Sequence, residues 1–183
     1  MICVTISKKI KNMQSKKIEA ALNKQIGLEG YSSFTYLAMA GWCENEAMDG
    51  CAKFLYRQSD EEREHMMKIF HYINEVDGKA ITPAIQQPQI DYKSVQQLFE
   101  AVYKQEQRVT ASINKIVALC YEEKDHATLN FLQWYVEEQR EEEALMRTIL
   151  DKINLIGTGA QSLYYIDKEL ERINKQEEQE IND

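Results

Sequence analysis

Glycine and proline are scarce in this chain, which has 7 glycines and 2 prolines among 183 residues. Sheets joined by tight turns need more of both, so the composition disfavours a strand-and-turn architecture. Long apolar runs are also absent, since none approaches the roughly 18 residues of a membrane span. The start, MICVTISKKIKN, has too short an apolar patch for a signal peptide, with the lysines on the wrong side of it. We expect one domain and no membrane segment.

Clusters of positive charge are lacking as well. The formal net charge is −8, and no group of Lys and Arg faces one side of a predicted helix, which argues against a nucleic-acid partner. The four cysteines show no CxxC spacing, and three of them fall in apolar stretches of predicted helices. Buried reduced thiols are the expected state of these three, and a reducing cytoplasm is the expected location.

Helical periodicity dominates the rest of the chain. It predicts a bundle of four long helices over residues 15–157, with N-caps at Ser15 and Ser94 and a helix end at Gly78. A short amphipathic fifth helix is predicted at 158–174, with an apolar face of Leu163, Ile166 and Leu170 suited to burial against other copies of the chain. Residues 1–14 are expected to form a poorly ordered extension, and residues 175–183 a frayed acidic tail.

Loop lengths constrain the topology of this bundle. Short connections make the first and second helices antiparallel neighbours, and likewise the third and fourth. The linker at 79–93 holds both prolines; about 15 residues reach roughly 50 Å, more than the roughly 40 Å of a helix of about 27 residues. The linker can therefore cross the whole bundle, although a flexible loop is the simpler alternative. The predicted fold class is all-α: a ferritin-like four-helix bundle with one long crossover and a short C-terminal helix.

Polar side chains interrupt the apolar stripe of each long helix near its middle. The interval of 33 residues between Glu29 and Glu62 (62 − 29) recurs between Glu106 and Gln139 (139 − 106), and EEREH resembles EQREE. The chain thus consists of two related helical hairpins, each with one acid on its first helix and an i, i+3 pair on its second. These residues are Glu29, Glu62, His65, Glu106, Gln139 and Glu142.

Such a set of buried acids is unfavourable unless cations lie among them. Glu together with Glu-x-x-His is a di-metal carboxylate pattern of helix bundles, and oxygen-rich ligation with one imidazole suits iron or manganese. The second hairpin has Gln139 and Glu142 instead of Glu and His, so one metal position should be weaker. Tyr36 shares the face of Glu29 and is expected to pack in the core and bond to a ligand. The alternative for each residue alone is a solvated acid or a structural histidine.

Four segments resemble the bacterial non-haem ferritins: LEGYSSFTYLAMAGWC, SDEEREHM, YKQEQ and FLQWYVEEQREEE. The similarity extends from Met13 to about Arg172. It implies a hollow shell of 24 subunits that oxidises Fe(II) with dioxygen or hydrogen peroxide and stores a ferric mineral. By this resemblance two irons form the ferroxidase centre. Glu29, Glu62 and His65 hold the first, with Glu62 bridging; Glu106 and Gln139 complete the second; Tyr36 lies near both.

The resemblance also implies a third iron position beside the first two. The residues that match its ligands are Glu61, Glu138, Glu141 and Glu142. Their alternative is an ordinary charged helix face. Two features depart from the family pattern. Arg63 stands where haem-binding relatives have methionine, so no haem is expected, and residues 1–12 precede the usual start of the family.

Three rival interpretations remain open from the sequence. A di-iron oxidase or peroxidase of the rubrerythrin type normally has Glu-x-x-His in both hairpins, and a Cys-rich segment often accompanies it; neither is found here. A DNA-protecting miniferritin has its metal site between subunits and an extra helix in the crossover. In a non-enzymatic helical scaffold, the acids would point to solvent.

Overall fold

A computed structural model describes residues 15–157 and 159–182, and this part of the chain contains five helices and no strand. The predicted extension at 1–14 lies outside the described residues. The helices are α1 (Lys16–Asn45), α2 (Asp49–Glu75), α3 (Val95–Glu123), α4 (His126–Ile156) and α5 (Ala160–Asn182). The all-α prediction is confirmed.

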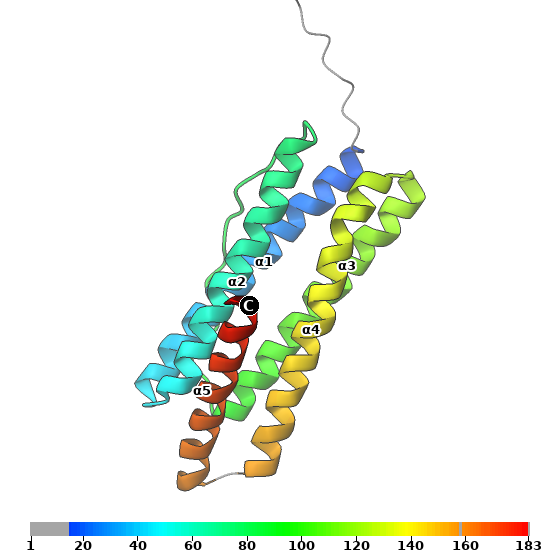
Figure 1. Ribbon diagram of the computed structural model, residues 1–183. Coiled ribbons are helices and arrows are strands. Elements are labelled where there is room, and N and C mark those ends of the chain that lie inside the picture. Colours follow the sequence, from blue (N-terminus) through cyan, green and yellow to red (C-terminus); the bar gives the residue numbers. More distant parts are fainter. Residues whose placement is uncertain (1–14, 158, 183) are drawn as a thin grey trace, which may run out of the picture.

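The first four helices form two antiparallel hairpins, α1–α2 and α3–α4, which pack side by side (Figure 1). The segment between α2 and α3 returns along the length of the bundle, so that α3 runs parallel to α2 (Figure 1). This is the predicted topology with one long crossover.

The crossover is attached to α1 along its path. Ile85 of the crossover packs close to the α1 backbone at Gly30. A Cβ at this position would lie only 3.0 Å from Ile85 Cδ1, so the close approach depends on glycine. Nearer the start of α1, the Asn23 side chain accepts from the Ile81 N–H at 2.7 Å and donates to the Lys79 carbonyl at 3.0 Å. These contacts argue against the loosely held loop that was the alternative from the sequence.

Capping residues begin and end the helices close to the predicted positions. The hydroxyls of Ser15 and Ser94 each accept from the backbone N–H three residues on, as predicted. At the end of α2 the left-handed residue is Asp77, with φ 59°, and not Gly78. The Gly78 N–H donates to the Ile73 carbonyl at 2.8 Å, so Gly78 occupies the next position of a Schellman motif. The prediction was wrong by one residue.

Two apolar clusters make up the core, and a polar layer separates them along the bundle. One cluster lies around Ile18, Ile73 and Leu132, and the other around Phe54, Phe99 and α5. The predicted stripes of α1, α3 and α4 are all buried. On α2, alternating steps of four and three residues from Cys51 predict Tyr72 as a buried residue near the end of the helix, but Ile73 is buried instead. Such steps average 3.5 residues and drift from the 3.6 of a straight helix.

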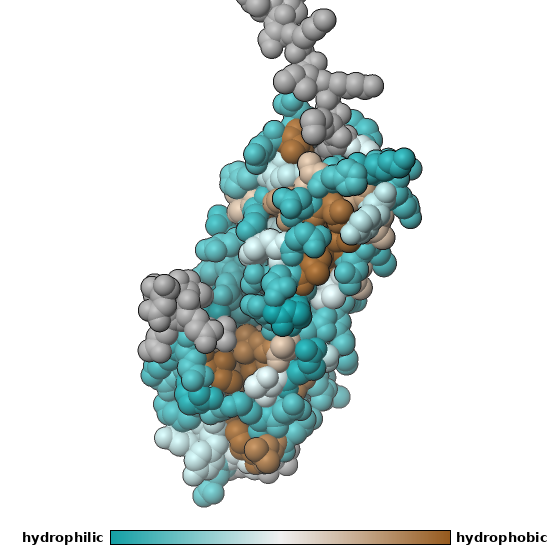
Figure 2. All heavy atoms as spheres, turned by 45° about the vertical axis from the view of Figure 1, so that its right-hand side comes forward, coloured by the Kyte–Doolittle hydropathy of each residue, from teal (hydrophilic) through white to brown (hydrophobic). Residues whose placement is uncertain are grey.

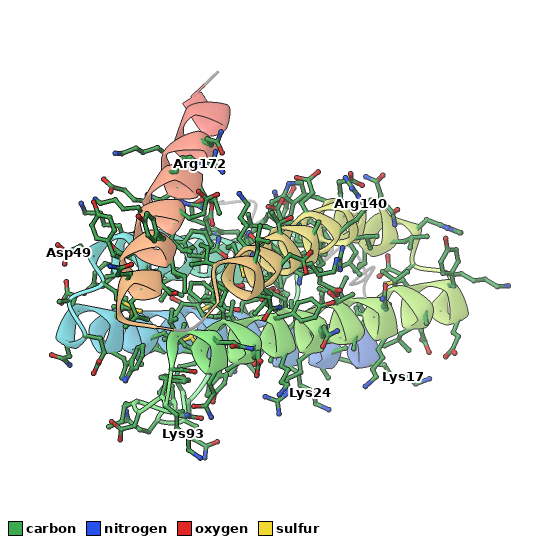
Figure 3. The ribbon with its side chains drawn as sticks, turned by 90° about the horizontal axis from the view of Figure 1, so that it is seen from below. Lys17, Lys24, Asp49, Lys93, Arg140 and Arg172 are labelled. Atoms are coloured by element: carbon green, nitrogen blue, oxygen red, sulfur yellow. The ribbon has the colours of Figure 1, made fainter. Side chains whose placement is uncertain are left out.

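Helix α5 differs from the prediction in length and in packing. It continues to Asn182 through most of the predicted tail, which contains no Gly or Pro to end a helix. At the start of that tail, Lys175 forms an i, i+4 ion pair with Glu171 at 2.9 Å, which stabilises the helix. Ile166 and Leu170 are buried within the subunit, whereas Leu163 is 45% exposed. Figure 3 shows α5 directed away from the long helices at an angle, with Arg172 in its second half, while the adjacent Ile173 and Asn174 remain buried.

The face shown in Figure 2 is mainly hydrophilic, and hydrophobic residues gather on it in a few separate patches. None of the described helices combines the length and the apolar character needed to cross a membrane.

Candidate metal centre

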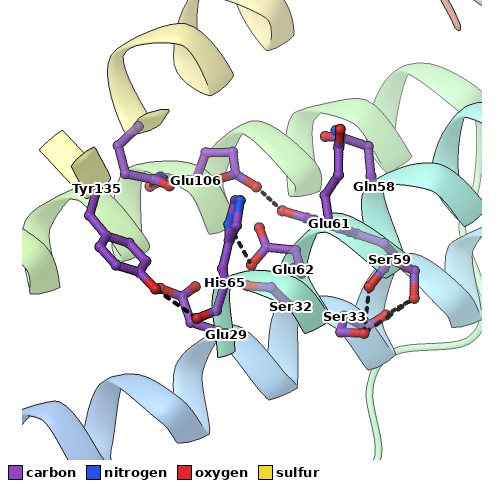
Figure 4. Close-up of polar contacts among 12 residues, drawn as sticks. Glu29, Ser32, Ser33, Gln58, Ser59, Glu61, Glu62, His65, Glu106 and Tyr135 are labelled. Atoms are coloured by element: carbon purple, nitrogen blue, oxygen red, sulfur yellow. Dashed lines mark hydrogen bonds and ion pairs between the residues drawn. The ribbon is translucent and has the colours of Figure 1, made fainter. Parts of the chain in front are cut away.

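Glu29 on α1 and Glu62 and His65 on α2 meet in the polar layer between the two halves of the core (Figure 4). One ligand atom from each lies within 4.8 Å of the other two, and His65 Nδ1 is 3.9 Å from Glu62 Oε2. In the described part of the chain this is the one group of three or more His, Cys, Asp or Glu side chains so arranged. The i, i+3 spacing of Glu62 and His65 places both side chains on one face of α2, as predicted.

Several ligand atoms of this centre are buried without a hydrogen bond. Glu29 Oε2, Glu62 Oε2, His65 Nδ1 and Glu142 Oε2 have no hydrogen-bond partner among the residues that the structure describes. Such groups are costly to bury unless an ion or water satisfies them. The two carboxylates of Glu29 and Glu62 and the imidazole of His65 form an oxygen-rich donor set that fits a divalent transition metal such as iron or manganese. The scaffold alternative, with acids directed to solvent, is wrong.

The α3–α4 hairpin completes the opposite side of the centre. Glu106 is fully buried; its Oε1 accepts from the Tyr36 hydroxyl, and its Oε2 accepts from Gln139 Nε2 at 3.1 Å. On the first hairpin, Gln25 Nε2 donates to Glu29 Oε1 at 2.9 Å. One oxygen of Glu29 and both oxygens of Glu106 are therefore oriented by neutral donors, which fixes both carboxyl groups before any cation binds.

Burial and mutual repulsion shift the acids toward their protonated forms. Burial, opposed by the Gln25 hydrogen bond, raises the pKa of Glu29 to about 7. Burial and then the charge of Glu106 hold the pKa of Glu62 and that of Glu142 well above the usual range. Burial also lowers the pKa of His65 to about 4, with a smaller contribution from Lys68. The imidazole is therefore neutral near pH 7, the form that coordinates metals.

The residues of the predicted third position extend from this centre toward the surface. Glu142 is buried, and Glu138 is half-buried with a pKa raised by burial and by Glu141. Glu61 accepts from Arg57 at 2.6 Å and also from the Gln58 side chain. Glu141 points outward, with its side chain 61% exposed and 3.0 Å from Arg140. Three of the four acids thus lie at or beside the centre, and Glu141 is at its rim.

Sequence reasoning missed three residues that orient the site. Gln25 and Arg57 each lie four residues before the acid they bond, so the i, i+4 spacing was an available signal. Tyr135 donates to the His65 carbonyl at 2.7 Å, and the sequence offers no signal for this contact beyond the place of Tyr135 on the apolar stripe of α4. The neighbouring Trp134 is partly exposed, and its ring packs edge to face against the His65 ring. Lys68 Nζ lies 3.4 Å from the centre of the Trp134 ring.

Comparisons with known proteins agree with this architecture. Residues 19–156 match the family model described as a ferritin-like domain. A probable bacterial non-heme ferritin-like protein of Haemophilus influenzae is 46% identical over 86% of this chain and 96% of its own. A bacterial non-heme ferritin of Campylobacter jejuni is 43% identical over 88% and 96% of the two chains.

A solved structure gives the same result in three dimensions. The open-pore ferritin of Archaeoglobus fulgidus superposes with a TM-score of 0.85 at 40% identity, covering 87% of this chain and 98% of its own. Fold, buried carboxylates and sequence similarity over most of its length agree, and this chain belongs to the bacterial non-haem ferritins of the ferritin family.

Proposed function

We propose that this protein is an iron-storage ferroxidase, which takes Fe(II) as substrate, oxidises it at a centre inside each subunit and stores the ferric product in an oligomeric shell. The observation that carries the proposal is the group of buried, unpaired ligand atoms on Glu29, Glu62 and His65. Its support is membership of the ferritin family over residues 19–156.

We assign two Fe(II) positions to the centre. Glu29, Glu62 and His65 hold the first, with Glu62 between the two, and Glu106 and Gln139 hold the second. The carboxamide of Gln139 carries no charge, so the second position binds its cation more weakly. Glu61, Glu138 and Glu142 hold a third ion, with Glu141 at the rim. Each Fe(II) loses one electron, which dioxygen or hydrogen peroxide accepts.

The protein's own contribution is placement and charge. Tyr36 and Gln139 keep Glu106 in position, and Gln25 does the same for Glu29. Because the acids are protonated more readily than usual, cation binding releases protons from them. The acids then change from protonated groups to charged ligands, and the metal-free centre returns to its protonated state when ferric iron leaves.

A paired-variant experiment tests the assignment. Aerobic stopped-flow absorbance after Fe(II) addition should show rapid oxidation in the wild type and a large loss of rate in Glu62→Ala with His65→Ala. The control, Glu64→Ala with His71→Ala, removes an acid and an imidazole from exposed positions of the same helix and should retain the rate. Equal oxidation by the two double variants refutes the site.

We also propose a shell of 24 subunits without haem, located in the cytoplasm. The three described cysteines, Cys43, Cys51 and Cys120, are buried free thiols, which supports a reducing compartment. With a subunit mass of 21.4 kDa, the shell should elute from a size-exclusion column at roughly 500 kDa. Elution as a monomer or dimer would exclude the storage function and favour an oxidase of the rubrerythrin type.

A further inference from the structure

Arg57 connects α5 to the acids beside the metal centre. Its Nε donates to Asn174 Oδ1 on α5 at 2.8 Å, and its Nη1 donates to Glu61 Oε1 at 2.6 Å. The guanidinium carbon lies 5.3 Å from the centre of the Phe54 ring, and the side chain is only 13% exposed. The guanidinium is therefore held in one place by a ring and two polar partners.

The carboxylate of Glu61 is occupied at both oxygens. Oε1 accepts from Arg57, and Oε2 accepts from Gln58 Nε2. A cation that uses Glu61 as a ligand must therefore replace at least one of these donors. Arg57 is the charged donor of the two, so it also repels an incoming cation.

The charges around Glu61 explain why a cationic side chain is placed there. Arg57, Glu61, Glu138 and Asn174 all line one open groove of about 950 Å³, which also reaches His65. Arg57 thus supplies positive charge where these acids repel one another.

We propose that Arg57 is a positioning residue of the third iron position: its guanidinium competes with Fe(II) for Glu61, and Asn174 on α5 holds it in place. The inference rests on the proposed function, because it concerns the third ion assigned there. Its consequence is a third position that binds weakly and releases its ion readily, with an affinity that depends on how α5 docks.

Anaerobic calorimetric titration with Fe(II) tests this inference without turnover. Arg57→Gln should tighten the weakest class of sites about tenfold, since a full charge is removed beside the ion, and should leave the tighter class unchanged. Asn174→Ala should produce a smaller increase in affinity, because Arg57 keeps its charge but loses its anchor. Arg172→Gln, which removes an exposed charge from α5, is the matched control and should bind as the wild type does.

A double-mutant cycle shows whether Arg57 acts through Glu61. The effect of Arg57→Gln should become clearly smaller when Glu61→Gln is already present, because only the direct repulsion between the guanidinium and the ion then remains. An undiminished effect in that background overturns the inference, and so does an Arg57→Gln protein that binds like Arg172→Gln. If the wild type shows no tight Fe(II) binding at all, the proposed function itself is refuted.

Arg57→Lys provides a second variant in case Arg57→Gln does not assemble. Circular dichroism and size-exclusion chromatography identify that case. A lysine keeps the charge but has one ammonium group in place of the planar fork that bonds both Glu61 and Asn174. Its weakest sites should bind more tightly than those of Arg172→Gln, by less than tenfold, and equal affinities would contradict the inference.

Discussion

The hydroxyl of Tyr36 on α1 donates a hydrogen bond to Glu106 on α3, so the two hairpins are joined directly at the level of the metal centre. Both side chains are completely buried. The bond links a core residue of the first hairpin to an acid that belongs to the second. The position of Glu106 at the centre therefore depends on how Tyr36 packs in the core of the bundle.

Removal of this hydroxyl should weaken the metal-free protein. Tyr36→Phe leaves Glu106 Oε1 without its donor, and a buried group that loses its partner costs about 1–3 kcal/mol. The free energy of unfolding in urea should fall by that amount. Tyr164→Phe removes a hydroxyl from a side chain that is 62% exposed and should change the stability little. Equal stability of the two variants would show that the bond contributes nothing.

The raised pKa values predict an unusual dependence of stability on pH. Burial raises the pKa of Glu29 in the folded state to about 7 from its ordinary 4.5, so between these values the folded state binds more protons than the unfolded state. The slope of the unfolding free energy with pH is then negative, and Glu29 alone accounts for a loss of about 3 kcal/mol as pH rises from about 4.5 to 7. Glu62 and Glu142 act in the same direction.

His65 opposes this trend at the acid end. Its folded pKa is lowered to about 4, so protonation of the unfolded state removes stability as pH falls from about 6.5 toward 4. The acids outnumber it, and the thermal midpoint of chelator-treated protein should therefore fall from pH 6 to pH 8. Glu29→Gln should flatten this decline. A midpoint that rises over that range would contradict the assigned protonation states.

Cation binding should stabilise the protein through the same residues. Under anaerobic conditions, Fe(II) at about 100 times its dissociation constant adds about 2.7 kcal/mol per site to the free energy of unfolding. Glu62→Ala with His65→Ala should lose most of this increase, whereas Glu64→Ala with His71→Ala should retain it. The shift in thermal midpoint on Fe(II) addition measures the difference. An equal shift in both double variants would place the stabilising ion elsewhere.

The sequence predicted that these polar side chains are buried, because each lies on a helix whose stripe could be followed independently. Glu29, Glu106 and Gln139 are buried where the period of their helices places them. Contacts across elements could not be predicted in this way. The bond from Arg57 to Asn174 depends on how α5 folds back against α2, and no local pattern fixes that angle. The length of α5 was underestimated because an acidic composition does not by itself end a helix.

The docking of α5 on α2 depends on a missing side chain at Gly50. A Cβ at this position would lie 2.2 Å from the Asp167 carbonyl oxygen, a distance that requires backbone to move. Asp167 also accepts from the Cys51 N–H at 2.9 Å, and so caps the start of α2, where Met48 provides no side-chain cap. The close approach of α5 to Gly50 and the cap that Asp167 provides at the start of α2 therefore depend on one another.

Gly50→Ala should displace α5 and lower the stability, although alanine favours helices. Gly41→Ala is the matched control, because a Cβ there meets nothing within 4 Å and the same exchange in an open helical site should stabilise by about 0.5–1 kcal/mol. Thermal midpoints should move in opposite directions, and trypsin should cleave α5 at Lys168 or Arg172 faster only in Gly50→Ala. Stabilisation by both changes would mean that α5 does not pack against α2 at this distance, because only a loosely docked helix could accept the added methyl group.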